Sequence, residues 1–435
     1  FLLDSQSNWS AAQKGYEDVL AMDPQHVKAL CGLAELNIER GQFKNAEDQM
    51  RKAVERDPNS GMAWYLLGVA RLKQGDGKEA MDCAYKAAKT LELIGPGYDL
   101  AGRALMALSD PKRAVEALKR AYAESPHDTQ IRNHLIAAFH ALGDDDNTIS
   151  SLITDARAAD PLDFVPQALA ALQGIDTWET FIGQWQAQCG EKEFTLLEAA
   201  CFLMDLNLLS DAETLLSKVC ASTNPPADLS PMPFYYLAFL NHALDRDAQA
   251  REYLTKAGAM PVDLVFPGRV EEVAVLEYAM STQKTDVHAQ LLLGYLTAGL
   301  GRLGDAVGLW EEVTAQDASL STAWRLLGYH AWKKKNDPGK AEEYYRKAIE
   351  ANAKDQVLYR DLAQLLTSQN RRGDAIALIE GMPQEPAPRF DALLWLAEAY
   401  VTEKRYDDCL TLLGKATFSN WEGAQGPHDI FVSAL

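Results

Sequence analysis

A repeat of 34 residues runs through the first third of this sequence. Pro24 and Pro58 are separated by 34 residues, and Pro126 follows after two more such steps. The same step joins two sets of alanines: Ala46, Ala80 and Ala114, and Ala53, Ala87 and Ala121. A period of about 20 to 50 residues is typical of stacked units that each pack only on their neighbours. The period therefore predicts a repeat array, which accommodates 435 residues without one very large core.

Small and large residues recur at fixed positions within each unit. When the unit is numbered from Val27, small residues fall at positions 8, 20 and 27, and large apolar residues at positions 4, 7 and 24; position 11 is large in the unit from Thr129, where it is Phe139. Small residues let two helices approach closely, and large ones fill the remaining space. Proline at position 32 ends the second helix, because it lacks an N–H and disfavours helix in the residue before it. The pattern predicts an all-α fold of helical hairpins.

The strength of the repeat varies along the chain and divides it into five predicted segments. They are a repeat array over 1–162 with a truncated first unit, a degenerate helical hairpin over 163–192, two further units over 193–264, a linker loop and single helix over 265–286, and a C-terminal array over 287–435. The pattern is interrupted at both ends of the chain. We therefore expect this sequence to be a fragment of a longer protein.

Charge and hydropathy limit the partners of the chain. The sequence has 42 Lys and Arg against 62 Asp and Glu, a formal charge of −20, and its longest basic run is Lys333–Lys335. Nucleic acid and anionic membrane are therefore not expected as partners. No apolar run reaches the ~18 residues of a membrane-spanning helix. The first residues do not resemble a signal peptide, and the six cysteines include no C-x-x-C pair, so we expect a cytoplasmic protein with reduced thiols.

The small residues at positions 8, 20 and 27 and the proline at position 32 resemble the tetratricopeptide repeat. The resemblance recurs in at least eight units across the whole chain. It implies a right-handed superhelical solenoid. It also implies that positions 2, 5, 9, 12 and 13 of each first helix line a concave groove.

In the units that begin at Ser321 and Gln356, these groove positions combine cationic and aromatic side chains. The candidate binding residues are Arg325, Tyr329, Trp332, Lys333, Arg360 and Gln364. Arginine can hold a carboxylate through two parallel hydrogen bonds, and aromatic rings add a stacking surface. The alternative is that the arginines form ion pairs with Asp or Glu of neighbouring repeats.

The second half of the chain carries a narrower resemblance over roughly 265–426, with its longest runs at residues 265–272, 323–328 and 421–426. It is similar to bacterial proteins that join an N-terminal β-sandwich, itself like galactose mutarotase, to a C-terminal tetratricopeptide array. This resemblance implies an adjacent β-sandwich domain as partner and, through that domain, a carbohydrate. Loop contacts are then expected from Phe266, Trp421, Glu422 and Gly423. The alternative is that Trp421 and Phe266 pack within the repeats and the glycines turn the chain. The usual Trp-Glu-Gly-Gly-Glu-Gly reads Trp-Glu-Gly-Ala-Gln-Gly here, so one glycine and one acid are missing.

The sequence carries no recognised catalytic signature. HExxH, GxSxG and P-loop motifs are absent, and His134 and His140 are spaced too unfavourably on a helix to bind one metal ion. No cofactor or metal is expected. Two hypotheses remain: a non-catalytic protein-interaction scaffold that supports an adjacent domain or partner, and the C-terminal part of a carbohydrate-active enzyme whose catalytic β-sandwich is not in this chain.

Overall fold

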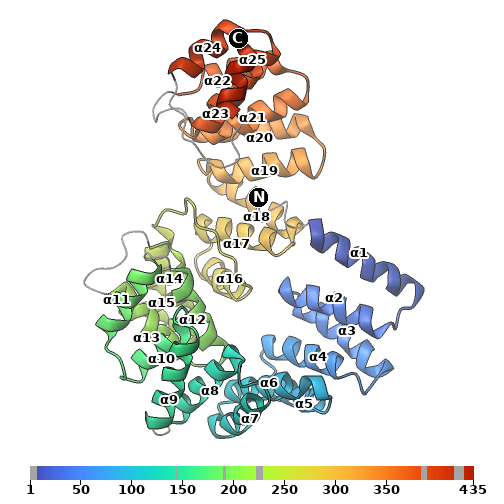
Figure 1. Ribbon diagram of the computed structural model, residues 1–435, viewed down its shortest axis with the longest axis vertical. Helices are drawn as coiled ribbons and strands as arrows, with labels where there is room; N and C mark the ends of the chain where they lie inside the picture. The colour runs from blue at the N-terminus through green and yellow to red at the C-terminus, as the bar shows by residue number, and fades with distance from the viewer. Residues whose placement is uncertain (1–6, 144–145, 190–192, 222–228, 384–388, 416–425) are drawn as a thin grey trace. The chain divides into compact units, whose positions relative to one another are not determined.

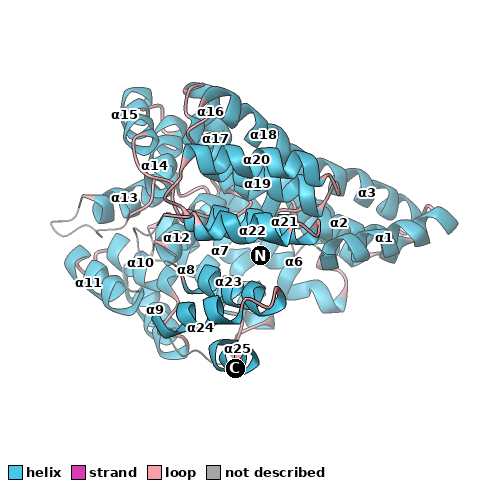
Figure 2. Ribbon diagram, turned by 90° about the horizontal axis from the view of Figure 1, so that it is seen from above, coloured by secondary structure: helices cyan, strands magenta, loops and turns pink. Residues whose placement is uncertain are grey.

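The computed structural model describes residues 7–143, 146–189, 193–221, 229–383, 389–415 and 426–435. Over these residues the chain forms 25 α-helices and one short 3-10 helix, joined by loops and without a strand (Figure 2). The prediction of an all-α repeat solenoid is confirmed. The chain divides into two compact units, Phe1–Leu303 and Gly304–Leu435.

In the first unit, successive helices pack as pairs that follow a curve from α1 to α17 (Figure 1). In chain order they are α1 (Ser7–Met22), α2 (Val27–Glu39), α3 (Phe43–Arg56), α4 (Gly61–Lys73), α5 (Gly77–Ala87), the 3-10 helix η1 (Leu91–Leu93), α6 (Ile94–Ala107), α7 (Pro111–Glu124), α8 (Thr129–Leu142), α9 (Asp146–Ala159), α10 (Phe164–Leu172), α11 (Trp178–Cys189), α12 (Phe194–Asp205), α13 (Leu209–Cys220), α14 (Met232–Ala243), α15 (Asp247–Gly258), α16 (Glu272–Thr282) and α17 (Val287–Gly299). Between α15 and α16 the chain leaves the paired pattern and runs as a long loop.

The second unit continues the same pattern of paired helices. It contains α18 (Leu303–Gln316), which begins at the unit boundary, α19 (Ser321–Lys333), α20 (Pro338–Ala351), α21 (Gln356–Ser368), α22 (Arg372–Glu380), α23 (Phe390–Thr402), α24 (Tyr406–Lys415) and α25 (Gly426–Ala434). The division into two units follows the packing of the backbone. The five segments inferred from the repeat strength stay a prediction.

The small repeat positions are points of close contact between helices. Ala46 and Ala53, at positions 20 and 27, are fully buried. A Cβ atom added to Gly68, at position 8, would lie 2.9 Å from Leu100 Cδ2 and 3.2 Å from the carbonyl oxygen of Ala80. Real Cβ atoms rarely approach other atoms so closely, so this position accepts little more than a hydrogen. The 34-residue ladder of small residues therefore has a packing cause.

Three aromatic residues at position 4 tie their own hairpins to the turn before them. The indole N–H of Trp64 donates to the carbonyl oxygen of Pro58 at 2.8 Å, and that of Trp324 donates to Ala318 at 3.0 Å. The hydroxyl of Tyr359 reaches Ala353 O at 3.1 Å in the same way. In each case the acceptor lies six residues earlier, in the turn that precedes the helix. Position 4 thus satisfies a turn carbonyl as well as filling space.

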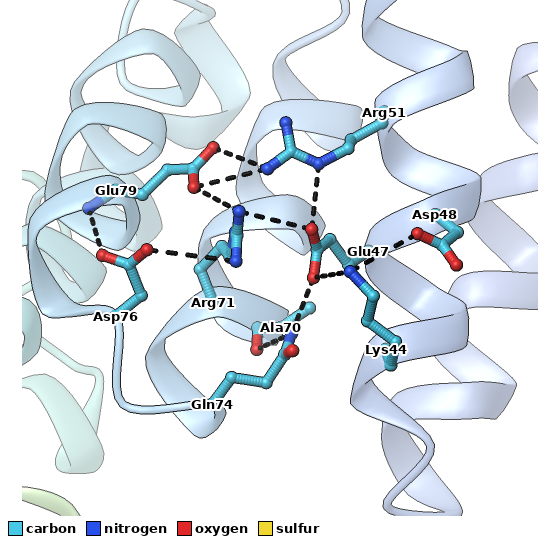
Figure 3. Close-up of polar contacts among 9 residues, drawn as sticks. All are labelled: Lys44, Glu47, Asp48, Arg51, Ala70, Arg71, Gln74, Asp76 and Glu79. Carbon is cyan, nitrogen blue, oxygen red and sulfur yellow. Dashed lines mark hydrogen bonds and ion pairs between the residues drawn. The ribbon is translucent and has the colours of Figure 1, made fainter.

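A polar network joins three helices of the first unit around Glu47 of α3 (Figure 3). The side chain of Glu47 is 2% exposed, and its carboxylate contacts Arg51 Nε at 2.9 Å and Arg71 Nη2 at 3.3 Å. Arg51 and Arg71 both continue to Glu79 on α5. Burial by itself would raise the pKa of Glu47, but the hydrogen bonds from Arg51, Lys44 and Gln74 and the charge of Arg71 lower it to about 2. The network therefore fastens α3 to α4 and α5 with ionised groups.

Candidate functional site

The predicted arginines of the second unit meet on one carboxylate. Arg325 Nε of α19 lies 2.7 Å from Asp361 Oδ2, and Arg360 Nη2 of α21 lies 2.9 Å from Asp361 Oδ1. Arg360 Nη1 also lies 2.5 Å from Asp391 at the start of α23. The arrangement is the cross-repeat pairing that the sequence left as the alternative. Ligand binding by these arginines stays a prediction.

The other predicted groove residues lie on the same two first helices. Tyr329 and Trp332 on α19 are half-buried, whereas Lys333 and Gln364 are exposed. The ammonium of Lys333 lies 3.4 Å from the centroid of the Trp332 ring, a cation–π contact. The carboxylate that organises the pair of arginines was missed from the sequence, although Asp361 directly follows Arg360.

The predicted loop contacts fall in two different parts of the chain. Trp421, Glu422 and Gly423 lie outside the described residues. Phe266 is in the loop before α16 and is 56% exposed. Its ring meets that of Tyr295 edge-on, with 5.5 Å between centroids. Phe266 is therefore packed against Tyr295 on one side and exposed on the other, and its role as a loop contact stays a prediction.

A site that the sequence reasoning did not name lies inside the first unit. A cavity of about 720 Å³ is lined by residues at positions 9, 12 and 13 of four repeat units. They are Leu72 and Lys73 of α4, Arg103 and Ala107 of α6, Met204 and Asp205 of α12, and Phe239 and Ala243 of α14. A second cavity of about 430 Å³ shares Arg103, Asp205 and Glu271 with the first. The inner faces of distant repeats thus surround one polar and apolar interior.

The centre of this interior is an ion cluster around Lys73. Its ammonium nitrogen lies 2.7 Å from Asp205 Oδ1 and 2.7 Å from Glu271 Oε1, with the lysine side chain 18% exposed. Arg103 Nη2 adds a longer contact of 3.7 Å to Asp205 Oδ2. Burial by itself would lower the pKa of Lys73, but the two carboxylates outweigh it and raise the pKa above its usual range. Lys73 is therefore charged at neutral pH and links segments that are far apart in sequence.

The loop before α16 supplies one wall of the larger cavity. Val270 packs against the turn after α2, since a Cβ atom on Gly41 would lie 2.8 Å from Val270 Cγ2. The guanidinium of Arg269 lies 4.2 Å from the centroid of the Phe194 ring and donates to the carbonyl oxygen of Phe194 at 3.2 Å. Residues 269–271 therefore contact inner-surface elements rather than a hairpin partner of their own.

A buried glutamate holds this loop in place. Glu272 is 3% exposed and accepts hydrogen bonds from the backbone N–H groups of Gly268 at 2.8 Å and Arg269 at 2.9 Å. The hydroxyl of Tyr236 donates to its other oxygen at 3.2 Å. Burial raises the pKa of Glu272, and the backbone donors partly oppose that shift. The Glu272 side chain thus accepts the hydrogen bonds of two loop amides, a role that main-chain carbonyls play in helices and strands.

Over the described ranges, no group of three His, Cys, Asp or Glu side chains is placed to hold a metal ion. Cys201 lines the smaller cavity, and burial raises its pKa to about 12, so its thiol is protonated and weakly nucleophilic at neutral pH. His134, which also lines it, contacts Asp99 Oδ1 through Nδ1 at 2.7 Å.

Of the helices in the described part of the chain, none has the length and apolarity to cross a bilayer.

The same position rule that selected Arg325 also identifies this site. Applied to the units from Gly61, Gly95 and Glu193, positions 9 and 13 include Lys73, Arg103 and Asp205. The missing information was that these positions face one another across the first unit. The curvature that brings them together accumulates over many repeats and has no single sequence signature.

Two curated proteins are similar to this chain over short stretches. Cellulose synthase 1 operon protein C of Komagataeibacter xylinus is 33% identical over 135 residues, which is 29% of this chain and 10% of that protein. Tetratricopeptide repeat protein 7B of Homo sapiens is 30% identical over 95 residues, 22% of this chain and 11% of that protein. The matches thus span about a tenth of the length of these relatives.

Solved structures and a family model are also similar to this chain. The crystal structure of MamA covers 37% of this chain and 88% of MamA at 20% identity and a TM-score of 0.32. YrrB, described as a TPR protein with an unusual peptide-binding site, covers 62% of this chain and 97% of YrrB at 16% identity and a TM-score of 0.26. The family model of the tetratricopeptide repeat matches residues 2–61, 31–91, 100–164 and 291–356, together half of the sequence. Because this family model matches half of the sequence, the chain belongs to the tetratricopeptide repeat family.

Proposed function

We propose that this chain is a non-catalytic interaction scaffold that binds a protein partner at the inner surface of its first unit. Tetratricopeptide repeats mediate protein–protein interaction, and the fold is typically non-catalytic. The observation that carries the proposal is the convergence of inner-helix positions from four repeat units on one cavity. A volume of about 720 Å³ lies within the range of ligand-binding clefts, which is about 300–1,000 Å³.

The walls of the cavity match the mixed chemistry of a peptide. Leu72, Met204 and Phe239 offer apolar surface, and Lys73 and Asp205 offer fixed charges of both signs. A peptide supplies apolar side chains, charged side chains and backbone polar groups in one ligand, so it can use all of these walls together. The ion pairs also give discrimination, because a ligand that leaves one of these charges unpaired binds weakly.

The inner face of α19 and α21 is proposed as a second contact surface. Arg325 and Arg360 are 37% and 25% exposed, and Tyr329 and Trp332 lie on the same helix as Arg325. A partner carboxylate there competes with Asp361 and Asp391, so we expect this surface to bind more weakly than an open pair of arginines would.

A site-specific photo-crosslinker tests the proposal. The exposed residue Ala274 of α16 lines the large cavity, and the exposed Lys52 of α3 does not. Each is replaced in turn by p-benzoylphenylalanine, and the chain is irradiated in a lysate of the organism that encodes it. We expect a protein cross-linked from position 274, absent from position 52, and identified by mass spectrometry. Identical products from both positions would contradict binding at the inner surface.

A carbohydrate-linked role is the second proposal, either through an adjacent β-sandwich domain or as part of an enzyme. It is supported by the short match to a protein named for a cellulose synthase operon. The test is a calorimetric titration of a glycan panel against this chain and against the full-length parent protein. Binding by the parent alone favours a sugar site in another domain, and binding by neither leaves the protein-partner scaffold as the better account.

A further inference from the structure

Three consecutive side chains of the loop before α16 contact three different inner-surface elements. Arg269 reaches Phe194 at the start of α12, Val270 reaches the turn at Gly41, and Glu271 reaches Lys73 at the end of α4. The side chains of Arg269 and Glu271 are 18% and 23% exposed. The contacted residues lie 75 positions away for Arg269 and 198 positions away for Glu271.

The segment Gly268–Glu271 contacts the groove as a bound peptide would, through successive side chains. The segment Gly268–Glu271 is not part of a helix, and the amides of Gly268 and Arg269 are held by the Glu272 side chain. Its attachment to the groove therefore comes from side chains rather than from a hydrogen-bonded ladder. Another chain with the same side chains in the same order could make the same contacts.

The groove also provides complementary chemistry for each position. The aromatic face of Phe194 and the carboxylate of Glu198, 3.8 Å from Arg269 Nη2, suit a guanidinium. The surface around Gly41 suits a branched aliphatic side chain, because glycine leaves room that a larger residue would fill. The ammonium of Lys73 suits a carboxylate.

We propose that Gly268–Glu271 is an internal ligand of the inner groove, and that the external partner presents a peptide with the same order of basic, branched aliphatic and acidic side chains. This inference rests on the proposed function and specifies its partner. The partner peptide binds by displacing the internal segment. Because the internal segment is tethered, its effective concentration is of the order of millimolar, and it keeps the groove closed to weak or incomplete ligands.

The test is binding of a labelled peptide to wild-type and opened chains. The probe is fluorescein-labelled Val-Phe-Pro-Gly-Arg-Val-Glu-Glu, the sequence of residues 265–272, and the readout is fluorescence anisotropy. The opened chain carries Val270→Ala and Glu271→Ala, which remove two of the three internal contacts. We expect at least tenfold tighter binding to the opened chain than to wild type. A scrambled peptide should bind neither.

Two further variants separate groove binding from a general loosening of the chain. Adding Lys73→Met to the opened chain should abolish peptide binding. The change Glu55→Gln alters an exposed residue of α3 that lines neither cavity, and it should leave binding at the wild-type level. An opened chain that is folded by circular dichroism but binds no peptide would overturn the inference.

A measurement on the wild-type chain decides the question if the opened chain does not fold. Excess unlabelled peptide should accelerate amide hydrogen exchange at 268–271 and leave α7 unchanged. Unchanged exchange at saturating peptide would contradict displacement. A partner cross-linked from position 274 without peptide binding would overturn only this inference, whereas failure of both experiments would overturn the proposed function as well.

Discussion

At the scale of single residues, the fold depends on positions where two helices lie so close that a larger side chain has no space. Gly68 is one of them, because a Cβ atom at this position would lie within 3.2 Å of Leu100, Ala80 and Cys83. Gly183, in the middle of α11, is exposed, and apart from its chain neighbours and its own helix backbone no atom lies within 4 Å of the corresponding point. The two glycines are both helical, so they form a matched pair in which only the space around the residue differs.

We expect Gly68→Leu to destabilise the first unit by about 1–3 kcal/mol or more, because the side chain must enter a filled contact between helices. Gly183→Leu should be neutral or slightly stabilising, since leucine favours helix over glycine by about 0.5–1 kcal/mol. Urea denaturation followed by circular dichroism measures both. Equal stability of the two variants would show that the repeat positions have been assigned wrongly.

Burial also decides the reactivity of individual thiols. It raises the pKa of Cys31 to about 11 and that of Cys83 to about 12, so both stay protonated at neutral pH. We expect iodoacetamide to leave them unmodified in the folded chain and to label them in urea. The matched control is Lys52→Cys, whose thiol lies at an exposed position of α3 and should react at the rate of a free cysteine. Rapid native labelling of Cys83 would contradict the packing of α5.

At the scale of helices, the Glu47 network adds ionic contacts to apolar packing. Its members come from α3, α4 and α5, so it connects two successive repeat units (Figure 3). Glu47 is nearly inaccessible, whereas Arg51 is 43% exposed, and the pairs are therefore only partly shielded from solvent. The contribution of the network to the free energy of unfolding should exceed that of a surface ion pair and fall below that of a fully buried one.

We expect Glu47→Gln to cost about 1–3 kcal/mol at neutral pH, because Arg51 and Arg71 then lose their shared partner. The folded pKa of about 2 lies below the ordinary value of 4.5, so the contribution is fully present above pH 4.5 and is lost as the pH falls through about 2. Denaturation of wild type and variant at pH 7, 4 and 3 measures this difference. The exposed Glu55→Gln on α3 is the control, and a difference between wild type and Glu47→Gln that does not change with pH would refute the pKa assignment.

The sequence predicted helices and turns better than it predicted the site. Alanine at positions 20 and 27 and proline at position 32 act within a few residues, so Ala53 is buried and α3 ends before Pro58 as expected. Position 13 likewise places Lys73 on the inner face of its repeat. Its partners Asp205 and Glu271 could not be predicted, because their proximity depends on the summed rotation of many repeats. Asp361, in contrast, lies in the repeat next to that of Arg325, so this pair falls within the expected alternative of ion pairs between neighbouring repeats.

At the scale of the first unit, Lys73 makes contacts that packing between adjacent repeats does not provide. Stability in a solenoid is approximately a sum over repeats and their adjacent interfaces. Lys73 instead joins residues 132 and 198 positions away. Arg103 and Val270 add further contacts among elements that are distant in sequence. The interior of the first unit is thereby held by charges as well as by the stacking of adjacent hairpins.

Replacing Lys73 with methionine tests how much this contact holds the loop. The variant keeps the length of the side chain but leaves Asp205 and Glu271 without their shared cation, so the two carboxylates repel each other. We expect amide exchange at 268–272 to accelerate at least tenfold, and exchange in α5 to stay unchanged because its contacts are local. The raised pKa of Lys73 adds a pH signature: its contribution is complete below the unfolded value of 10.5 and is lost as the pH rises through the higher folded value, so wild type should approach the variant only at strongly alkaline pH. The exposed Lys52→Met is the matched control. Equal protection of 268–272 in all three chains would show that packing of Val270 and the Glu272 hydrogen bonds hold the loop without the ion cluster.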